Sequence, residues 1–136
     1  MIARTAALAF ATLAVALAGC SQADAGTTPP MDDQGRYVIT MTSSLTFEPA
    51  KAKIPAGATV VWVNSASMPH DVAGYEGDPI KSDFSAFSSS DPPPQGLGAL
   101  IPPGGSYNHT FTAKGPWTIW CHTHHEERMS GIITVT

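Results

Sequence analysis

Short runs typical of β-strands recur along the chain from Tyr37 onward; some alternate apolar and polar residues, and residues 59–64 are rich in β-branched residues and Trp. They predict strands over six segments: 37–42, 45–49, 59–64, 106–113, 117–121 and 129–136. Turns that contain Gly and Pro are expected between them, at residues 55–57 and 114–116. Many short strands separated by turn residues predict an all-β domain built as a sandwich or a barrel.

The alternation also assigns side chains to faces, because neighbouring strand residues point in opposite directions. Trp117, Ile119 and Cys121 share the face that is expected to be buried, and Trp120 points away from it. His109 shares a face with two aromatic residues and is expected to be a core or edge histidine.

One long stretch, residues 74–105, breaks the alternating pattern. It is rich in Gly, Pro, Ser and Asp. A loop of this length in a compact domain usually has a function or contains a short element. We expect irregular structure here, and residues 82–87 are the candidate for one helical turn.

The N-terminal segment is typical of an export signal. Arg4 precedes an apolar run that is too short to span a membrane, and the run ends in Leu17-Ala18-Gly19-Cys20. This ending resembles a bacterial lipoprotein signal, which implies that residues 1–19 are removed and that Cys20 carries a lipid. The alternative is an ordinary secretory signal in which Cys20 is incidental. Either case predicts an extracytoplasmic protein, on the periplasmic side or at the cell surface.

Composition divides the exported part of the chain in two. Residues 20–35 are small, polar and contain Pro and Gly, as in a flexible tether. Residues 36–136 have the length of one ordinary domain. Without Arg4 the chain has six Lys/Arg and eleven Asp/Glu, a formal charge of −5. No basic patch occurs, so nucleic acid is not expected as a partner, and the acidic excess favours a basic one.

The stretch 120–129 holds a thiol, three imidazoles and a thioether. If Cys20 is lipidated, Cys121 has no disulfide partner, and a free thiol is a liability outside the cytoplasm. Sulfur and imidazole suit a copper ion that alternates between Cu(I) and Cu(II), and an electron-transfer copper takes one Cys, two His and a distant Met. Cys121, His124 and Met129 supply three of these four ligands.

This stretch resembles the ligand loop of the cupredoxins, the blue copper proteins, and it is closest to the plastocyanin and pseudoazurin type. The resemblance extends over residues 36–136. It is carried by these segments: Phe47-Glu48-Pro49, Ile54-Pro55-Ala56-Gly57, Thr59 to Asn64, Pro69-His70-Asp71, Gly105 to Phe111, Gly115 to Cys121 and Met129 to Val135. The resemblance implies a Greek-key β-sandwich or barrel and one bound copper ion. The implied ligands are His70, Cys121, His124 and Met129.

Two histidines, His122 and His125, remain outside this ligand set. His125 could replace His124 only with a different loop geometry. Cys121, His122, His124 and His125 can also be interpreted as the ligands of a structural zinc site. Against this, adjacent strand residues point to opposite faces, so Cys121 and His122 would not easily converge on one ion.

Three positions depart from the family pattern. Asp71 stands where the family usually has Asn, and His122 where it usually has Ser or Thr; in the family these positions lie together. We therefore expect a hydrogen bond or ion pair between Asp71 and His122 beside the ligands. The reduction potential should then depend on pH, because His titrates near neutrality. Residues 125–128 are charged where relatives are small and apolar, so partner docking should depend on ionic strength if they take part.

The ligand set predicts an electron carrier rather than an enzyme, because four protein ligands leave no position for a substrate. A rigid β scaffold also limits movement of the ion, which speeds electron transfer. We expect a monomer, anchored by its lipid, that passes single electrons between redox proteins at an extracytoplasmic membrane surface. A c-type cytochrome or a membrane oxidoreductase would be a suitable partner. The alternative is a copper-binding or copper-delivery protein of the cell envelope.

Trp120 is a candidate electron port. The resemblance places it where plastocyanins have an exposed aromatic residue beside a docking region, and it is bonded directly to Cys121. The alternative is a half-buried Trp that serves packing alone.

Overall fold

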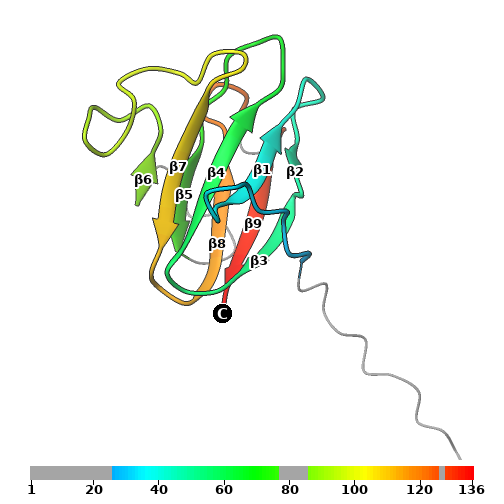
Figure 1. The fold of residues 1–136 in the computed structure, drawn as a ribbon. Helices are drawn as coiled ribbons and strands as arrows, with labels where there is room; N and C mark the ends of the chain where they lie inside the picture. Colours follow the sequence, from blue (N-terminus) through cyan, green and yellow to red (C-terminus); the bar gives the residue numbers. More distant parts are fainter. Residues whose placement is uncertain (1–25, 77–85, 126–127) are drawn as a thin grey trace, which may run out of the picture.

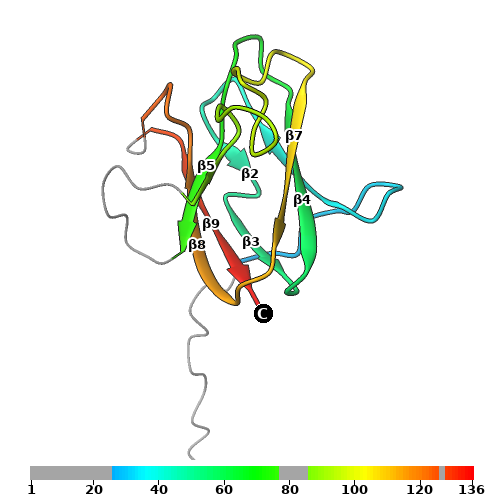
Figure 2. The ribbon, with the colours of Figure 1, turned by 90° about the vertical axis from the view of Figure 1, so that its left-hand side faces the viewer.

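The computed structural model describes residues 26–76, 86–125 and 128–136, which form two β-sheets packed face to face (Figures 1 and 2). The strands are β1 (Tyr37–Met41), β2 (Phe47–Glu48), β3 (Lys51–Ile54), β4 (Ala58–Asn64), β5 (Ala73–Glu76), β6 (Phe87–Ser88), β7 (Ser106–Phe111), β8 (Gly115–Trp120) and β9 (Ser130–Val135). None of the described residues is helical, and this part of the chain has no helix that could cross a membrane. The all-β prediction is confirmed.

The order of the strands determines which loops meet. One sheet has the order β2-β1-β4-β7 and the other β3-β9-β8-β5-β6. The pairs β1–β4 and β3–β9 are parallel, and the remaining pairs are antiparallel. In the β8–β9 register, Trp120 lies opposite Ser130 and Gly115 lies opposite Val135. The connection from β8 to β9 therefore lies at the end of the sandwich far from the C-terminus (Figure 2).

The inward faces of the two sheets form one core, as the alternation predicts. Trp117 and Cys121 contribute to this core from β8 and the residue that follows it. Trp62 of the central strand β4 is fully buried, and its ring centroid lies 6.1 Å from that of Phe111. Trp120 lies on the opposite face of β8, in a second, smaller cluster. Full burial of a large apolar side chain stabilises the fold by about 1.5–3 kcal/mol.

Three strands, β3, β5 and β6, are absent from the sequence prediction. All are short, and each is defined by pairing with a neighbour: β3 with β9, β5 with β8 and β6 with β5. The tertiary context decides such segments, because strand preference depends on the neighbouring strand. The turn expected at residues 114–116 is wrong, since β8 begins at Gly115. Pro116 is tolerated there because β5 pairs only with the later residues, from Trp117 to Trp120.

The candidate helical turn at residues 82–87 is not found in its described part. Phe87 lies in strand β6, and residues 82–85 lie outside the described residues. From Ser89 to Ile101 the chain forms turns and irregular structure, as expected.

Part of the segment predicted as a tether forms backbone hydrogen bonds with the domain. Residues 26–35, which we call the N-terminal strap, pair with the domain instead of forming a free tether. The Thr27 N–H donates to the Lys51 carbonyl at 3.0 Å, and the Lys53 N–H donates to the Thr27 carbonyl at 2.9 Å. The strap thus covers the outer edge of β3, which would otherwise be an unpaired sheet edge. The predicted signal and the rest of the tether, residues 1–25, lie outside the described residues.

Candidate metal centre

Two connecting segments meet at the end of the sandwich where β8 ends. Cys121 follows β8 and Met129 precedes β9, and the Cys121 N–H donates to the Met129 carbonyl at 3.1 Å. His70 lies shortly before β5, which is antiparallel to β8. The beginning of β5 therefore lies beside the end of β8, and His70 reaches the segment that carries Cys121.

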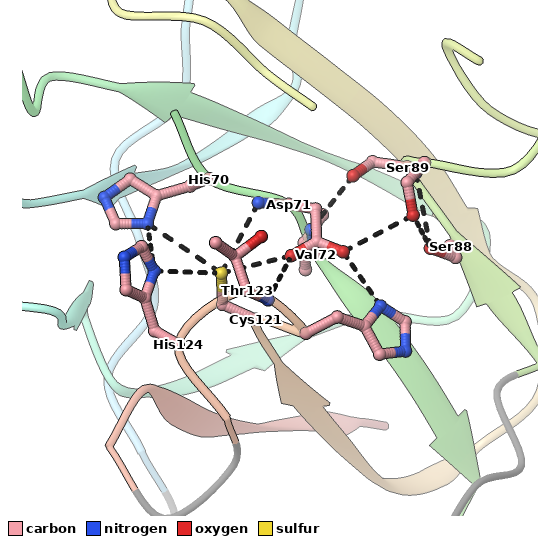
Figure 3. A network of polar contacts seen from close by, with 10 residues as sticks. His70, Asp71, Val72, Ser88, Ser89, Cys121, Thr123 and His124 are labelled. Carbon is pink, nitrogen blue, oxygen red and sulfur yellow. Dashed lines mark hydrogen bonds and ion pairs between the residues drawn. The ribbon is translucent and has the colours of Figure 1, made fainter. Parts of the chain in front are cut away.

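Three donor atoms converge in this region (Figure 3). Nδ1 of His70 lies 3.1 Å from Nδ1 of His124 and 3.8 Å from Sγ of Cys121. Sγ of Cys121 lies 3.3 Å from Nδ1 of His124. His70 and Cys121 are fully buried, whereas His124 is half-buried. The imidazole of His124 therefore links the buried donor atoms to the protein surface.

The distances between these atoms fit a single metal ion. With metal–nitrogen bonds of about 2.0 Å, a metal–sulfur bond of about 2.3 Å and angles of about 100–120°, donor atoms would lie about 3.1–3.7 Å apart. The separations of 3.1, 3.3 and 3.8 Å agree with this range to within about 0.1 Å. One thiolate and two imidazoles are donors that suit copper.

Comparison with known proteins identifies the family. Residues 35–136 match the family described as copper binding proteins of the plastocyanin/azurin family. The chain belongs to this family. It is 37% identical to a plastocyanin from Scenedesmus fuscus over 93 residues, which cover 68% of this chain and 88% of that protein. It is 36% identical to a chloroplastic plastocyanin from Fritillaria agrestis, also over 93 residues; the match covers 68% of this chain and 53%, about half, of that relative.

A solved structure supports the fold of this cupredoxin. A purple cupredoxin from Nitrosopumilus maritimus superimposes with a TM-score of 0.53 at 21% identity, over 73% of this chain and 98% of that chain. A likeness at this identity shows the fold alone. Together with the family match, it confirms the cupredoxin fold, and membership of the copper-binding family confirms one copper ion as the cofactor.

Met129 is held by its backbone and by core packing. Its side chain is fully buried in the cluster that also contains Cys121. Its N–H donates to the His125 carbonyl at 3.0 Å. Met129 therefore lies next to Cys121 through the hydrogen bond between their backbones, and its role as the weak, distant thioether ligand stays a prediction.

The backbone of His70 is held from one side by Ile101, a residue that the sequence prediction did not select. The His70 N–H donates to the Ile101 carbonyl at 3.1 Å, and the Ile101 N–H donates to the His70 carbonyl at 2.7 Å. The side-chain amide of Asn64, at the end of β4, donates to the Ile101 carbonyl at 3.0 Å. These hydrogen bonds hold the backbone of His70 in place independently of a bound metal ion.

The structure contains the expected contact between Asp71 and His122. Nδ1 of His122 lies 2.8 Å from Oδ2 of Asp71. The other oxygen, Oδ1, accepts from the Cys121 thiol at 3.1 Å and from the Thr123 N–H at 3.3 Å. Asp71 is only 1% exposed, so its carboxylate is a buried group surrounded by donors from the segment that follows β8.

Burial changes the proton affinity of two donors. It raises the pKa of the Cys121 thiol to about 11. It also lowers the pKa of His70, and the nearby His124 lowers it further. In the metal-free protein at neutral pH the thiol therefore keeps its proton and the His70 imidazole is neutral. Binding of a metal cation to Cys121 would release that proton.

The two remaining histidines do not join the donor cluster. His122 directs Nδ1 to Asp71, and its side chain is 46% exposed. His125 is exposed and has a φ of 60°. Within the described residues, the group of side chains that could hold a metal ion comprises His70, Cys121 and His124. The arrangement expected for the zinc alternative is therefore not formed.

Trp120 is more buried than the resemblance implies. It is 7% exposed. Its ring lies edge-on to Tyr75 with centroids 5.2 Å apart, and edge-on to His122 with centroids 5.3 Å apart. Trp120 therefore packs well, and its ring contacts His122, whose side chain extends to the surface.

The sequence prediction also missed Ser90, whose hydroxyl donates to Oδ2 of Asp71 at 3.4 Å. Serines are common in loops, so a single one does not indicate a site. The signal that was available is the run Ser88-Ser89-Ser90 in a stretch that is otherwise rich in Gly and Pro.

Proposed function

We propose that this cupredoxin carries single electrons between redox partners at an extracytoplasmic membrane surface, with His70, Cys121, His124 and Met129 as copper ligands. When bound, copper supplies one-electron chemistry by alternating between Cu(I) and Cu(II). The observation that carries the proposal is the convergence of three donor atoms, all within 4.8 Å of one another, at a largely buried position.

Donors that are held in place favour electron transfer. Ile101 holds His70 through two backbone hydrogen bonds, and Met129 holds Cys121 through one. Cu(I) and Cu(II) prefer different geometries, so a fixed donor set reduces the rearrangement between the two oxidation states. With Met129 as the fourth ligand no position remains for a substrate. We therefore infer a carrier and not an enzyme.

The surface around His124 is the proposed docking end for partners. Leu100 is 38% exposed and directly precedes Ile101, which pairs with His70. Leu97 in the same connection is 45% exposed. An apolar contact here would bring a c-type cytochrome or a membrane oxidoreductase near the half-buried imidazole, with the cupredoxin acting as a monomer. The two glutamates of the charged loop that was expected to take part lie outside the described residues.

Trp120 is proposed as a second route for electrons. It is joined to Cys121 by one peptide bond, and its ring contacts the partly exposed His122. Because Trp120 itself is buried, a partner on this side would approach His122 rather than Trp120. Asp71, which binds His122, would then influence both the ligand sulfur and this route.

The proposed location depends on the sequence alone. The apolar run that ends at Cys20 supports export and a lipid anchor. Only five residues, 21–25, separate Cys20 from the strap at Gly26, so a fully extended chain would span at most about 22 Å between the two. A lipid on Cys20 would therefore keep the domain close to the membrane surface.

The visible spectrum of the full-length protein loaded with Cu(II) tests the proposal. We expect an intense thiolate-to-copper charge-transfer band, because Cys121 lies among the donors. Cys121→Ser should abolish the band, and the matched control Cys20→Ser should leave it unchanged. If wild-type protein binds copper stoichiometrically without this band, the histidines hold the metal without the thiolate. The copper-delivery function, which the exposed His125 favours, would then replace the carrier.

A further inference from the structure

Three consecutive serines, residues 88–90, lie near Asp71. Figure 3 shows Ser88 and Ser89 on the side of Asp71 away from Cys121. Ser88 belongs to β6 and pairs with Ala73 of β5. Ser88 is 2% exposed and Ser89 is fully buried. Buried hydroxyl groups are costly unless they form hydrogen bonds. The partners of these serines therefore indicate what the segment does.

Ser89 fixes the backbone immediately after Asp71. Its N–H donates to the Val72 carbonyl at 2.8 Å, and its Oγ accepts from the Val72 N–H at 2.9 Å. On the other side of Asp71, Ile101 holds His70 through two backbone hydrogen bonds. The hydrogen bonds of the residues before and after Asp71 therefore fix its backbone. Other contacts must orient its side chain.

Ser88 and Ser90 form a directed chain of hydroxyl groups that ends on Asp71. Oγ of Ser90 donates to Oδ2 of Asp71 at 3.4 Å and lies 2.9 Å from Oγ of Ser88. The Ser90 N–H also donates to Oγ of Ser88 at 3.3 Å. A hydroxyl has one proton to donate. When Ser90 gives its proton to the carboxylate, Ser88 is the donor to Ser90.

Asp71 transmits this orientation to the segment that follows β8. Oδ2 is shared between Ser90 and His122, whereas Oδ1 contacts the sulfur of Cys121 and the N–H of Thr123. A rotation of the carboxylate would therefore change its contacts with all three residues of that segment. Charge and hydrogen bonding around a ligand sulfur tune the bound metal.

We propose that Ser90, supported by Ser88, is a positioning residue of the copper site. It orients the carboxylate of Asp71 and thereby sets the charge beside the Cys121 sulfur. The inference rests on the proposed function in one respect, the assignment of Cys121 as a copper ligand. Without the Ser90 hydroxyl, Asp71 loses a donor that partly offsets its charge. More negative charge beside the ligand sulfur favours Cu(II) over Cu(I), so the reduction potential should fall.

The reduction potential of the copper-loaded, full-length protein is the first measurement. Ser90→Ala should lower it, Ser88→Ala should lower it by less, and Ser90→Thr, which keeps a hydroxyl, should stay close to wild type. Thr110→Ala is the matched control. It removes an exposed hydroxyl that lies 2.8 Å from the hydroxyl of Thr59, its partner in the β4–β7 pair, and it should leave the potential unchanged.

The second measurement uses metal-free protein. Ser90→Ala should shift the NMR amide resonance of Thr123, whose N–H donates to Asp71, and Thr110→Ala should not. An unchanged potential would overturn the proposal whether or not this resonance moves, because the copper would then not sense Ser90. If the resonance moves but no charge-transfer band exists in the wild type, Ser90 does orient Asp71. The assignment of Cys121 as a ligand would fail instead.

Discussion

His109 shows how burial changes the chemistry of one side chain in this fold. Its ring stacks on Phe87 with centroids 3.9 Å apart and an interplanar angle of 14°. The ring also meets Phe111 edge-on at 5.0 Å. The half-buried position agrees with the expectation of a core or edge histidine. Burial lowers the pKa of His109, because a desolvated imidazolium is disfavoured.

We predict that His109 makes the fold less stable in mild acid. An unfolded histidine titrates at about pH 6.5, and the pKa of His109 in the fold is lower. As the pH falls through about 6.5, the unfolded state binds more protons, and the free energy of unfolding decreases. Urea unfolding of copper-loaded protein at about pH 7.5 and 5.5 should show a smaller loss for His109→Gln than for wild type.

Equal losses in the two proteins would contradict this role of His109. Among the described residues, Asp91 and Tyr107 are the other titratable groups that line the same pocket as His109. Both are unchanged in His109→Gln, so the difference between the two proteins isolates the imidazole.

At the scale of elements, the pairing of distant segments determines structure that composition alone does not predict. The strap consists of small and polar residues, yet Thr27 pairs with both Lys51 and Lys53, and Val38 donates to the Pro30 carbonyl at 2.8 Å. β3 needs a partner on its outer edge, because an exposed sheet edge carries unpaired backbone groups. The strap supplies that partner, and neither segment alone shows the pairing.

We predict that the strap stabilises the domain. A chain that begins at residue 36 loses the three backbone hydrogen bonds that join Thr27 and Pro30 of the strap to residues 38, 51 and 53. At about 0.5–1.5 kcal/mol each, their loss should lower the free energy of unfolding by about 1.5–4.5 kcal/mol. Urea denaturation of the two chains measures the difference. Thr27→Ala in the longer chain keeps the backbone bonds and serves as the control, and equal midpoints for the two chains would rule out a stabilising strap.

At the scale of the whole molecule, the donor cluster joins distant parts of the chain. His70 lies on the connection from β4 in one sheet to β5 in the other, and Cys121 follows β8. The donors come together only when both sheets are formed. A metal ion held by all of these donors therefore binds the native state more tightly than the unfolded chain.

We predict that copper stabilises the native protein. A ligand present at about 100 times its dissociation constant raises the free energy of unfolding by about 2.7 kcal/mol. The melting temperature should rise on addition of copper and fall again on chelation. Cys121→Ser should show a much smaller rise, and Cys20→Ser should behave as wild type. The same rise in Cys121→Ser as in wild type would show that the donor cluster does not hold the ion.

The elements and residues predicted from sequence share one property, a signal that is local. The run that became β7 alternates, the run that became β8 alternates from Trp117, and the run that became β4 is rich in β-branched residues and Trp, so each indicates a strand by itself. Cys121, His124 and Met129 lie within nine positions of one another, and their residue types point to copper. The pairing of Asp71 with His122 came from the family resemblance and is present in the structure.

The sequence by itself therefore determined the all-β class, the main strands and the chemistry of the ligand loop. The tertiary structure alone decided that the strap pairs with β3, that Ile101 holds His70, and that Ser90 reaches Asp71. Each of these contacts joins residues separated by many positions, from 19 between Asp71 and Ser90 upward. Such contacts arise from the way the two sheets bring loops to the same end of the sandwich, and periodicity within a segment carries no information about which distant segment will lie beside it.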